Sequence, residues 1–283
     1  MKLNELNWVD FLKKKVKKSK RVLVGIGDDC ALVKIKNRQA LLKSDLFIED
    51  IHFKLKKTPF KTIGMRAVSR VLSDFAACAG WPKFLGISMG ISRDINEKNL
   101  KEILNGIEYL SKKYNFDFVG GDTASTKKLF LDVWALGVAN RFIKRNTARE
   151  GDYIFLTGKL GERKFNKAFT PRLKEANYLA KNFKVNSMID VSDGFMLDLY
   201  RILRESKKGA LLYKKNIPIK KESDLYRGED YELVFTVSRD EKRLNLLKSK
   251  FYFVGKIKDS HFGYKITNGS KVSSVIVKGY THF

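Results

Sequence analysis

The chain has 283 residues, 43% hydrophobic and 31% charged, which suits one large domain or two ordinary domains with a buried core. It carries 57 Lys and Arg against 31 Asp and Glu, a formal net charge of +26. No long uncharged apolar run predicts a membrane-spanning helix, and the first residues lack the apolar centre of a secretion signal, so we expect neither a membrane partner nor secretion.

The positive charge is distributed in short lysine-rich runs, such as KKKVKKSKR at 13–21 and YKKN at 213–216. No signature of a DNA- or RNA-binding module accompanies them, so we interpret them as a lysine-rich surface and expect no dedicated nucleic-acid partner. The same positive field would favour anionic small substrates. The two cysteines, Cys30 and Cys78, have no CxxC spacing, which predicts reduced thiols and a cytoplasmic location.

Hydrophobic periodicity predicts alternating helices and strands in the first half of the chain. We expect Leu6, Val9, Phe11 and Leu12 on one side of the first predicted helix, and apolar residues recur at helical spacing within 97–114. In chain order we expect a helix at 4–20, strands at 22–26, 31–35 and 40–48, a helix at 64–80, a strand at 84–91, a helix at 97–114 and a strand at 129–139.

The polar segment 140–152 has no clear period, and we interpret it as the hinge between two halves of the chain. The alternation of strands and helices on both sides of it favours an α/β or α+β fold with two domains, 1–140 and 141–283. After the hinge we expect strands within 153–161, 186–194, 231–238, 250–257 and 273–279, and a helix from residue 195 that ends at Gly209.

Acidic residues recur after predicted strand ends, usually behind a small residue, as in GIGDDCALV at 25–33. All of them lie among apolar residues, and buried carboxylates repel one another unless cations lie between them. Mg²⁺ takes oxygen ligands from a few carboxylates and from substrate phosphates. The acids concerned are Asp28, Asp29, Asp45, Asp74, Asp122, Asp190, Asp193, Glu229 and Asp230.

Each of these acids taken singly is also compatible with an ordinary turn or helix cap, and Ser192 with an N-cap. Gly120 and Gly121 would let a phosphate approach the backbone beside Asp122, and His52 is compatible with a substrate contact or a structural role. The P-loop, protein-kinase and dinucleotide-binding signatures are absent. The residues alone therefore indicate a Mg²⁺-dependent enzyme of phosphoryl or nucleotide chemistry.

The motifs and their order resemble the thiamine-monophosphate kinase family, part of the superfamily of aminoimidazole ribonucleotide and selenophosphate synthetases. The similarity runs from residue 25 to the end of the chain, and SDGF together with GEDYEL is typical of the kinase branch. The matching stretches are GIGDDCALV, SDLFIEDIHF, AVSRVLSDFAACAGWP, FVGGDTAS, GDYIFLTGKLG, IDVSDGFMLDL, GEDYELVFTV and KGYTHF.

The resemblance implies that the chain phosphorylates thiamine monophosphate with ATP, giving thiamine diphosphate and ADP, and that it forms a homodimer. It implies the two-domain aminoimidazole ribonucleotide synthetase-like fold, in which an N-terminal sheet-and-helix domain dimerises and binds metal and ATP, and a C-terminal α/β domain completes the cleft. Several Mg²⁺ ions would be held by Asp29, Ser44, Asp45, Asp74, Asp122, Asp190 and Asp193. ATP would contact Gly121, Asp122, Arg145 and Ser192, and thiamine phosphate would contact His52, Glu229 and Tyr280.

Because the acceptor is already an anionic phosphate, we expect Mg²⁺-assisted, direct in-line transfer with no covalent enzyme intermediate. The chain departs from the family at Lys43, where a small hydroxyl residue is usual, at Arg227, which replaces a glycine, and in the short segment 159–187. One alternative is a sister ATP-dependent synthetase, although no glycine-rich segment with a reactive cysteine is present. The other is a basic nucleic-acid-binding protein that has lost catalysis, which the intact acidic set opposes.

Overall fold

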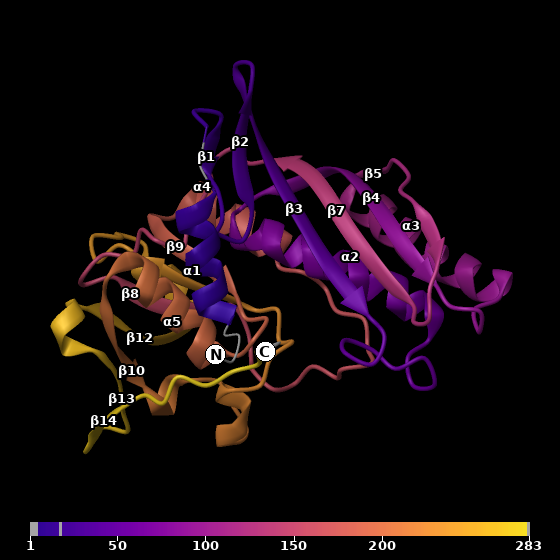
Figure 1. Ribbon diagram of the computed structural model, residues 1–283. Coiled ribbons are helices and arrows are strands. Elements are labelled where there is room, and N and C mark those ends of the chain that lie inside the picture. The colour runs from indigo at the N-terminus through magenta and orange to yellow at the C-terminus, as the bar shows by residue number, and fades with distance from the viewer. Residues whose placement is uncertain (1–4, 17–18, 282–283) are drawn as a thin grey trace.

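The computed structural model describes residues 5–16 and 19–281, and within them the chain forms two sheets linked and covered by helices (Figure 1). This mixed α/β architecture confirms the predicted fold class. No helix within the described ranges is long and apolar enough to cross a membrane. The helices are α1 (Glu5–Lys15), α2 (Phe60–Ala77), α3 (Glu97–Tyr114), α4 (Leu173–Asn182), α5 (Phe195–Ser206) and α6 (Leu244–Lys250).

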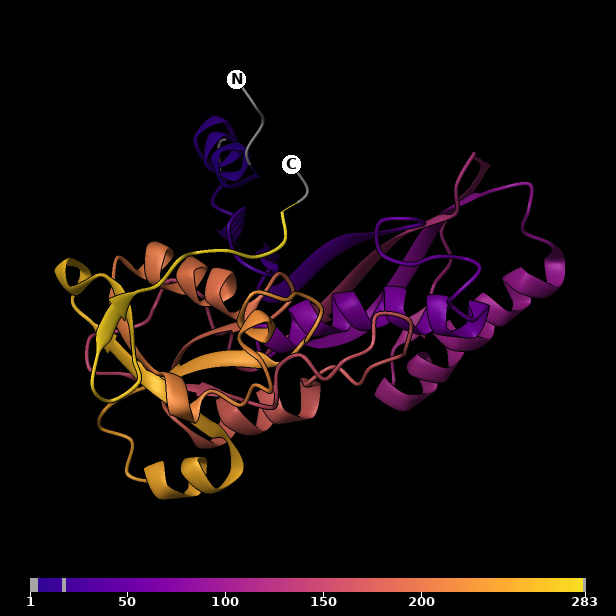
Figure 2. The ribbon, with the colours of Figure 1, turned by 90° about the horizontal axis from the view of Figure 1, so that it is seen from below.

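The first sheet has the order β1–β2–β3–β7–β4–β5, and β6 also pairs with β4. Helices α2 and α3 lie along one of its faces (Figure 2). On the other face Trp134 lies across Gly86, where an added Cβ would come within 2.3 Å of the indole ring. The strands are β1 (Val22–Val24), β2 (Ala31–Ile35), β3 (Arg38–Ile48), β4 (Trp81–Ile91), β5 (Asp117–Phe118), β6 (Thr123–Ser125) and β7 (Phe130–Val138).

The second sheet has the order β14–β13–β10–β12–β8–β11–β9, and α5 packs against β9 and β11. Helix α2 contacts both β9 and the first sheet, so it connects the two sheets. The larger apolar cluster accordingly contains residues of both halves, such as Leu72 and Phe235, and the division into domains at residue 140 stays a prediction. The strands are β8 (Tyr153–Leu156), β9 (Val185–Asp190), β10 (Gly209–Tyr213), β11 (Leu233–Val237), β12 (Tyr252–Lys258), β13 (Tyr264–Thr267) and β14 (Val272–Ser274).

The predicted elements of the first half lie close to the observed ones. The helix at 97–114 and the strand at 31–35 are confirmed to the residue. The helix predicted at 64–80 starts and ends earlier, at Phe60–Ala77. Of the first predicted helix, residues 4, 17 and 18 lie outside the described residues, as do the last two residues of KGYTHF.

Two predictions in the second half are wrong. Helix α5 ends at Ser206, because Lys207 adopts the left-handed conformation (φ 54°) that terminates it. Gly209 instead opens β10, where a Cβ would lie 2.5 Å from the carbonyl oxygens of Asp259 and Gly263. The strand predicted at 273–279 ends at Ser274, the last residue that pairs with β13.

Candidate functional site

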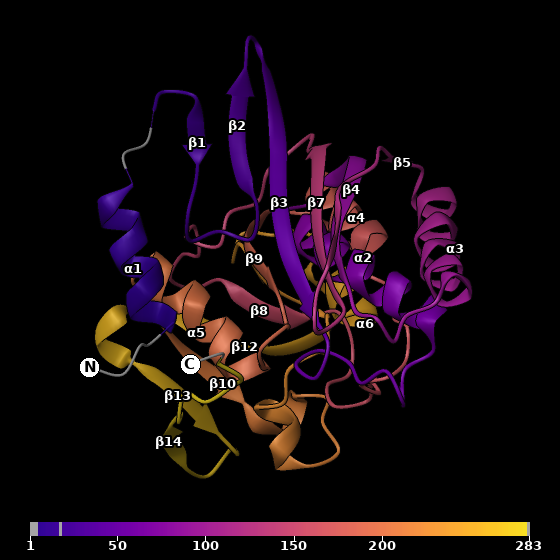
Figure 3. The same cartoon turned by 45° about the vertical axis from the view of Figure 1, so that its right-hand side comes forward.

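A cavity of about 510 Å³ lies where the first sheet, α2, α5 and the loop before β11 meet. Helix α1 borders it beside α5 (Figure 3), and Lys13 Nζ lies 2.5 Å from Glu205 Oε1 across that contact. The cavity wall is densely charged, with both signs interspersed. Its charged residues are Lys13, Asp28, Asp29, Lys43, Asp45, Arg70, Asp74, Arg145, Asp190, Asp193, Arg201, Arg204, Glu205, Arg227 and Glu229.

Three buried carboxylates meet in the cavity wall. Asp29 follows β1, Asp74 lies in the last turn of α2 and Asp190 ends β9, and one oxygen of each lies within 4.8 Å of the others. Asp29 Oδ2 is buried, and no described residue donates to it. Burial, and then repulsion by the neighbouring carboxylates, raises the pKa of Asp190 to about 7 and the pKa of Asp74 well above its ordinary value. The cluster therefore favours a bound cation.

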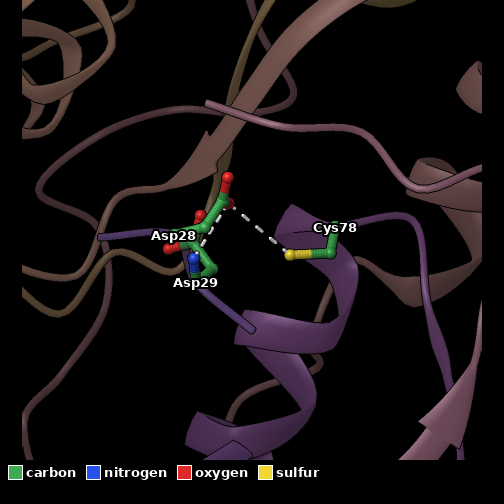
Figure 4. A group of neighbouring side chains, drawn as sticks. All are labelled: Asp28, Asp29 and Cys78. Carbon is green, nitrogen blue, oxygen red and sulfur yellow. Dashed lines mark hydrogen bonds between the residues drawn. The ribbon is translucent and has the colours of Figure 1, made fainter. Parts of the chain in front are cut away.

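The loop GIGDDC docks onto the C-terminal end of α2, where Asp28 and Asp29 lie beside Cys78 (Figure 4). The Cys78 thiol lies 4.0 Å from Asp28 Oδ1, which also accepts the backbone N–H of Asp29 at 3.0 Å. Burial and the charge of Asp29 raise the pKa of Asp28 to about 6. Cys30 and Cys78 are free and buried, and burial raises the pKa of both thiols, so they stay protonated. This contact between the loop and α2 places the carboxylate of Asp29 next to that of Asp74.

Four of the predicted metal ligands form ion pairs with basic side chains. Although burial opposes it, Arg70 and Lys43 hold the pKa of Asp45 below its ordinary value. The pairs offset part of the negative charge, so the site balances both signs in a small volume. The N–O distances are 2.5 Å for Arg145 and Asp29, 3.1 Å for Arg70 and Asp45, 2.9 Å for Lys43 and Asp74, and 2.6 Å for Arg201 and Asp193.

The three predicted substrate residues line this same cavity. His52 is buried, and its Nδ1 accepts the backbone N–H of Ile48 at 2.9 Å. Glu229 has a positive φ of 69° and forms an ion pair with the buried Arg66; such strained backbone is common at functional sites. Tyr280 exposes 47% of its surface, and its backbone N–H donates to the Asp193 carbonyl at 2.8 Å.

Arg145 and Ser192 also line the cavity, whereas three other predicted site residues are not part of its described lining. Ser44 is exposed and donates to Asp132 Oδ1 at 2.6 Å, because it points to the sheet face opposite Lys43 and Asp45. Gly121 and Asp122 are exposed beside β4, and Asp122 Oδ1 accepts the backbone N–H of Thr123. Their predicted roles stay predictions.

Two expectations about local structure at the acids are wrong. Asp45 lies inside β3 and Asp74 inside α2, so neither follows a strand end. Ser192 is not the N-cap of α5, which is Gly194. Instead, Asp198 Oδ2 accepts the backbone N–H groups of Asp193 and Gly194, both at 3.0 Å. This carboxylate, which belongs to the helix itself, accepts hydrogen bonds from free backbone N–H groups at the start of the helix, as the side chain of a serine cap would.

The basic residues of α2 were not among the predicted site residues. Arg66 is 1% exposed and packs between the rings of Phe47 and Phe165. Arg70 donates to Tyr231 Oη at 2.8 Å and to Glu229. A signal was present, since Arg66, Arg70 and Asp74 are spaced by four residues and therefore share one helix face within an otherwise apolar segment.

Known proteins are similar to this chain over its whole length. Residues 27–139 match the family model described as AIR synthase related protein, N-terminal domain. The thiamine-monophosphate kinase of Buchnera aphidicola subsp. Schizaphis graminum is 32% identical over 100% of both chains. That of Bacillus subtilis is 30% identical, over 92% of this chain and 93% of its own. A solved structure described as AaThiL complexed with AMPPCP and TMP has a TM-score of 0.86 and 25% identity, covering 100% of this chain and 99% of that one.

Proposed function

Because this chain belongs to the thiamine-monophosphate kinase family, we propose that it transfers the γ-phosphoryl group of ATP to thiamine monophosphate, giving thiamine diphosphate and ADP. The names of its relatives support this reaction. The complex with AMPPCP and TMP in a similar structure supports the two ligands. Within this chain, the observation that carries the proposal is the meeting of Asp29, Asp74 and Asp190 in a cavity that also holds arginines.

The acidic cluster fits Mg²⁺. The buried Asp29 Oδ2 has no described donor, and the three converging groups offer the hard oxygen ligands that this ion prefers. Bound Mg²⁺ would neutralise the charge that phosphates gather during transfer. The predicted metal ligands that line the cavity are Asp29, Asp45, Asp74, Asp190 and Asp193.

Basic residues would orient the phosphates for direct transfer. An oxygen of the acceptor phosphate bonds to the γ-phosphorus as the bond to the bridging oxygen of ADP breaks, so no enzyme-linked intermediate forms. Arg145 pairs with Asp29 and lines the cavity, where its guanidinium would donate to a phosphate oxygen. The backbone at Ser192, which also lines the cavity, would contact the nucleotide.

Three side chains would bind the acceptor. The Nδ1 of His52 accepts the Ile48 N–H, which fixes the ring in the cavity wall, where it would contact the substrate. Glu229 is held by Arg66 and would accept hydrogen bonds from the substrate. The half-exposed ring of Tyr280 would stack on the flat, cationic thiazolium.

We further propose a homodimer that covers the outer face of the first sheet. This face exposes large apolar side chains on β3, β4 and β7, a pattern typical of an interaction surface. Ser44 lies on it and Gly121 and Asp122 lie at its β4 edge, so their predicted roles require the assembled dimer. The two free cysteines support a location in the cytoplasm, where conditions are reducing. The exposed apolar residues are Leu42, Leu46, Phe84, Trp134 and Val138.

The proposal is tested by measuring ADP release from ATP and Mg²⁺ with thiamine monophosphate, with free thiamine and without acceptor. We expect turnover with the monophosphate, because the cavity combines a carboxylate cluster with basic side chains that would bind phosphates. Equal ADP release in all three reactions would show an ATPase. No release with either thiamine compound would reject the kinase assignment and direct the search to synthetase substrates.

A further inference from the structure

Lys43 places a positive charge inside the acidic cluster. It lies on β3 two residues before Asp45, so both side chains point to the cavity side of the sheet. Its Nζ lies 2.9 Å from Asp74 Oδ2, and the two side chains are 24% and 13% exposed. Little water therefore separates the charges, and the ammonium offsets one of the three converging carboxylates.

The position of this ammonium is set by the sheet. Lys43 is paired with Ala135 of β7, in the middle of the long β3–β7 ladder. Its partner Asp74 belongs to the buried face of α2, which packs on the same sheet. The other lysine of the cavity, Lys13, pairs with Glu205 on α5 and is not part of the three-carboxylate cluster.

An ammonium and a divalent ion compete for the Asp74 oxygen. The Lys43 Nζ lies within hydrogen-bond distance of Asp74 Oδ2. Its positive charge would repel a metal ion that approached the same oxygen. Of the neighbouring carboxylates, Asp29 pairs with Arg145 through its Oδ1 atom, at 2.5 Å. Asp29 Oδ2 has no described donor, and Asp190 Oδ2 accepts the Ser73 hydroxyl at 2.7 Å.

We propose that Lys43 takes the place of one divalent ion: it is a resident cation that neutralises Asp74 beside Asp45, and within the three-carboxylate cluster it leaves metal binding to Asp29 and Asp190. This inference rests on the proposed function for the identity of the metal cluster. Lys43 is then a positioning residue: its side chain supplies part of the positive charge that bound ions would otherwise bring to the cluster. Removing the ammonium would open Asp74 to an additional ion.

The test counts Mn²⁺ ions bound to the full chain by equilibrium dialysis and electron paramagnetic resonance, without nucleotide or thiamine. We expect Lys43→Ser and Lys43→Met each to bind one more Mn²⁺ per chain than the natural protein. Lys43→Arg, which keeps the charge, and Lys13→Ser, a matched lysine of the same cavity, should bind the natural number. An unchanged or reduced number in both neutral variants would overturn the proposal.

Thermal unfolding provides a second readout, because the neutral variants lose the counter-ion of Asp74. Their unfolding temperature should fall in EDTA and rise with Mn²⁺ by more than that of the natural protein, and failure of Mn²⁺ to restore them would also overturn the proposal. Neither readout needs turnover. An inactive natural protein with the expected Mn²⁺ numbers would reject only the kinase proposal, and an active protein with unchanged numbers would reject only the role of Lys43.

Discussion

Replacement of Asp190 by Asn should stabilise the metal-free protein at neutral and alkaline pH. Asp190 is 2% exposed, and burial together with the charge of Asp29 raises its pKa from 3.8 to about 7. The folded state therefore binds this proton more tightly than the unfolded state, so stability falls as the pH rises from about 4 to about 7. At about 1.36 kcal/mol for each pH unit, the ionised side chain costs on the order of 4 kcal/mol above pH 7.

Urea unfolding in EDTA measures this effect directly. At about pH 4, Asp190→Asn and the natural protein should have the same free energy of unfolding. At about pH 8, the value for Asp190→Asn should be higher by several kcal/mol. The Asn amide oxygen can still accept the Ser73 hydroxyl, so this hydroxyl keeps its acceptor. The control is Asp240→Asn, whose side chain is 75% exposed and should change neither value. If Asp190→Asn is equally or less stable than the natural protein at alkaline pH, the reasoning is refuted. With Mg²⁺ added, the natural protein should gain more stability than the variant.

Three further changes test other parts of the structure. Glu229→Gln should lower the free energy of unfolding by about 3 kcal/mol, because it removes the carboxylate paired with the buried Arg66. It should also raise the KM for thiamine monophosphate. An unchanged KM would exclude Glu229 from the substrate site. Trp134→Lys should convert a dimer to a folded monomer in light scattering, since it charges the exposed apolar face; a persistent dimer would place the interface elsewhere. Gly209→Ala should cost about 1–3 kcal/mol in thermal or urea unfolding, because its Cβ would lie 2.5 Å from the Asp259 carbonyl oxygen, and a neutral result would contradict that close approach.

Local sequence patterns were sufficient where an element carries its own signals. Helix α3 has an apolar stripe, and its N-cap Asn96 accepts the backbone N–H of Asn99, so its bounds are predictable. Helix α4 has no side-chain N-cap, and its short length makes its stability depend on packing against α2. Strands β5 and β6 have two and three residues and exist through their pairing with β4. Such elements depend on the assembled fold.

The acids of the site could be found in the sequence because they interrupt apolar segments, but their partners could not. The pairing of Lys43 with Asp74 depends on how α2 packs on β3, and the meeting of Asp29 with Asp190 depends on how the two sheets approach each other. One part was predictable and missed: strand alternation alone places Ser44 on the face opposite Lys43 and Asp45.

The most direct test of the acidic cavity as the kinase site follows a labelled γ-phosphate from ATP to thiamine monophosphate in the presence of Mg²⁺. The natural protein and Asp240→Asn should form labelled thiamine diphosphate at similar rates, whereas Asp190→Asn should be slower by at least about 100-fold. Equal label transfer by Asp190→Asn, or label found only in inorganic phosphate with the natural protein, would contradict this account.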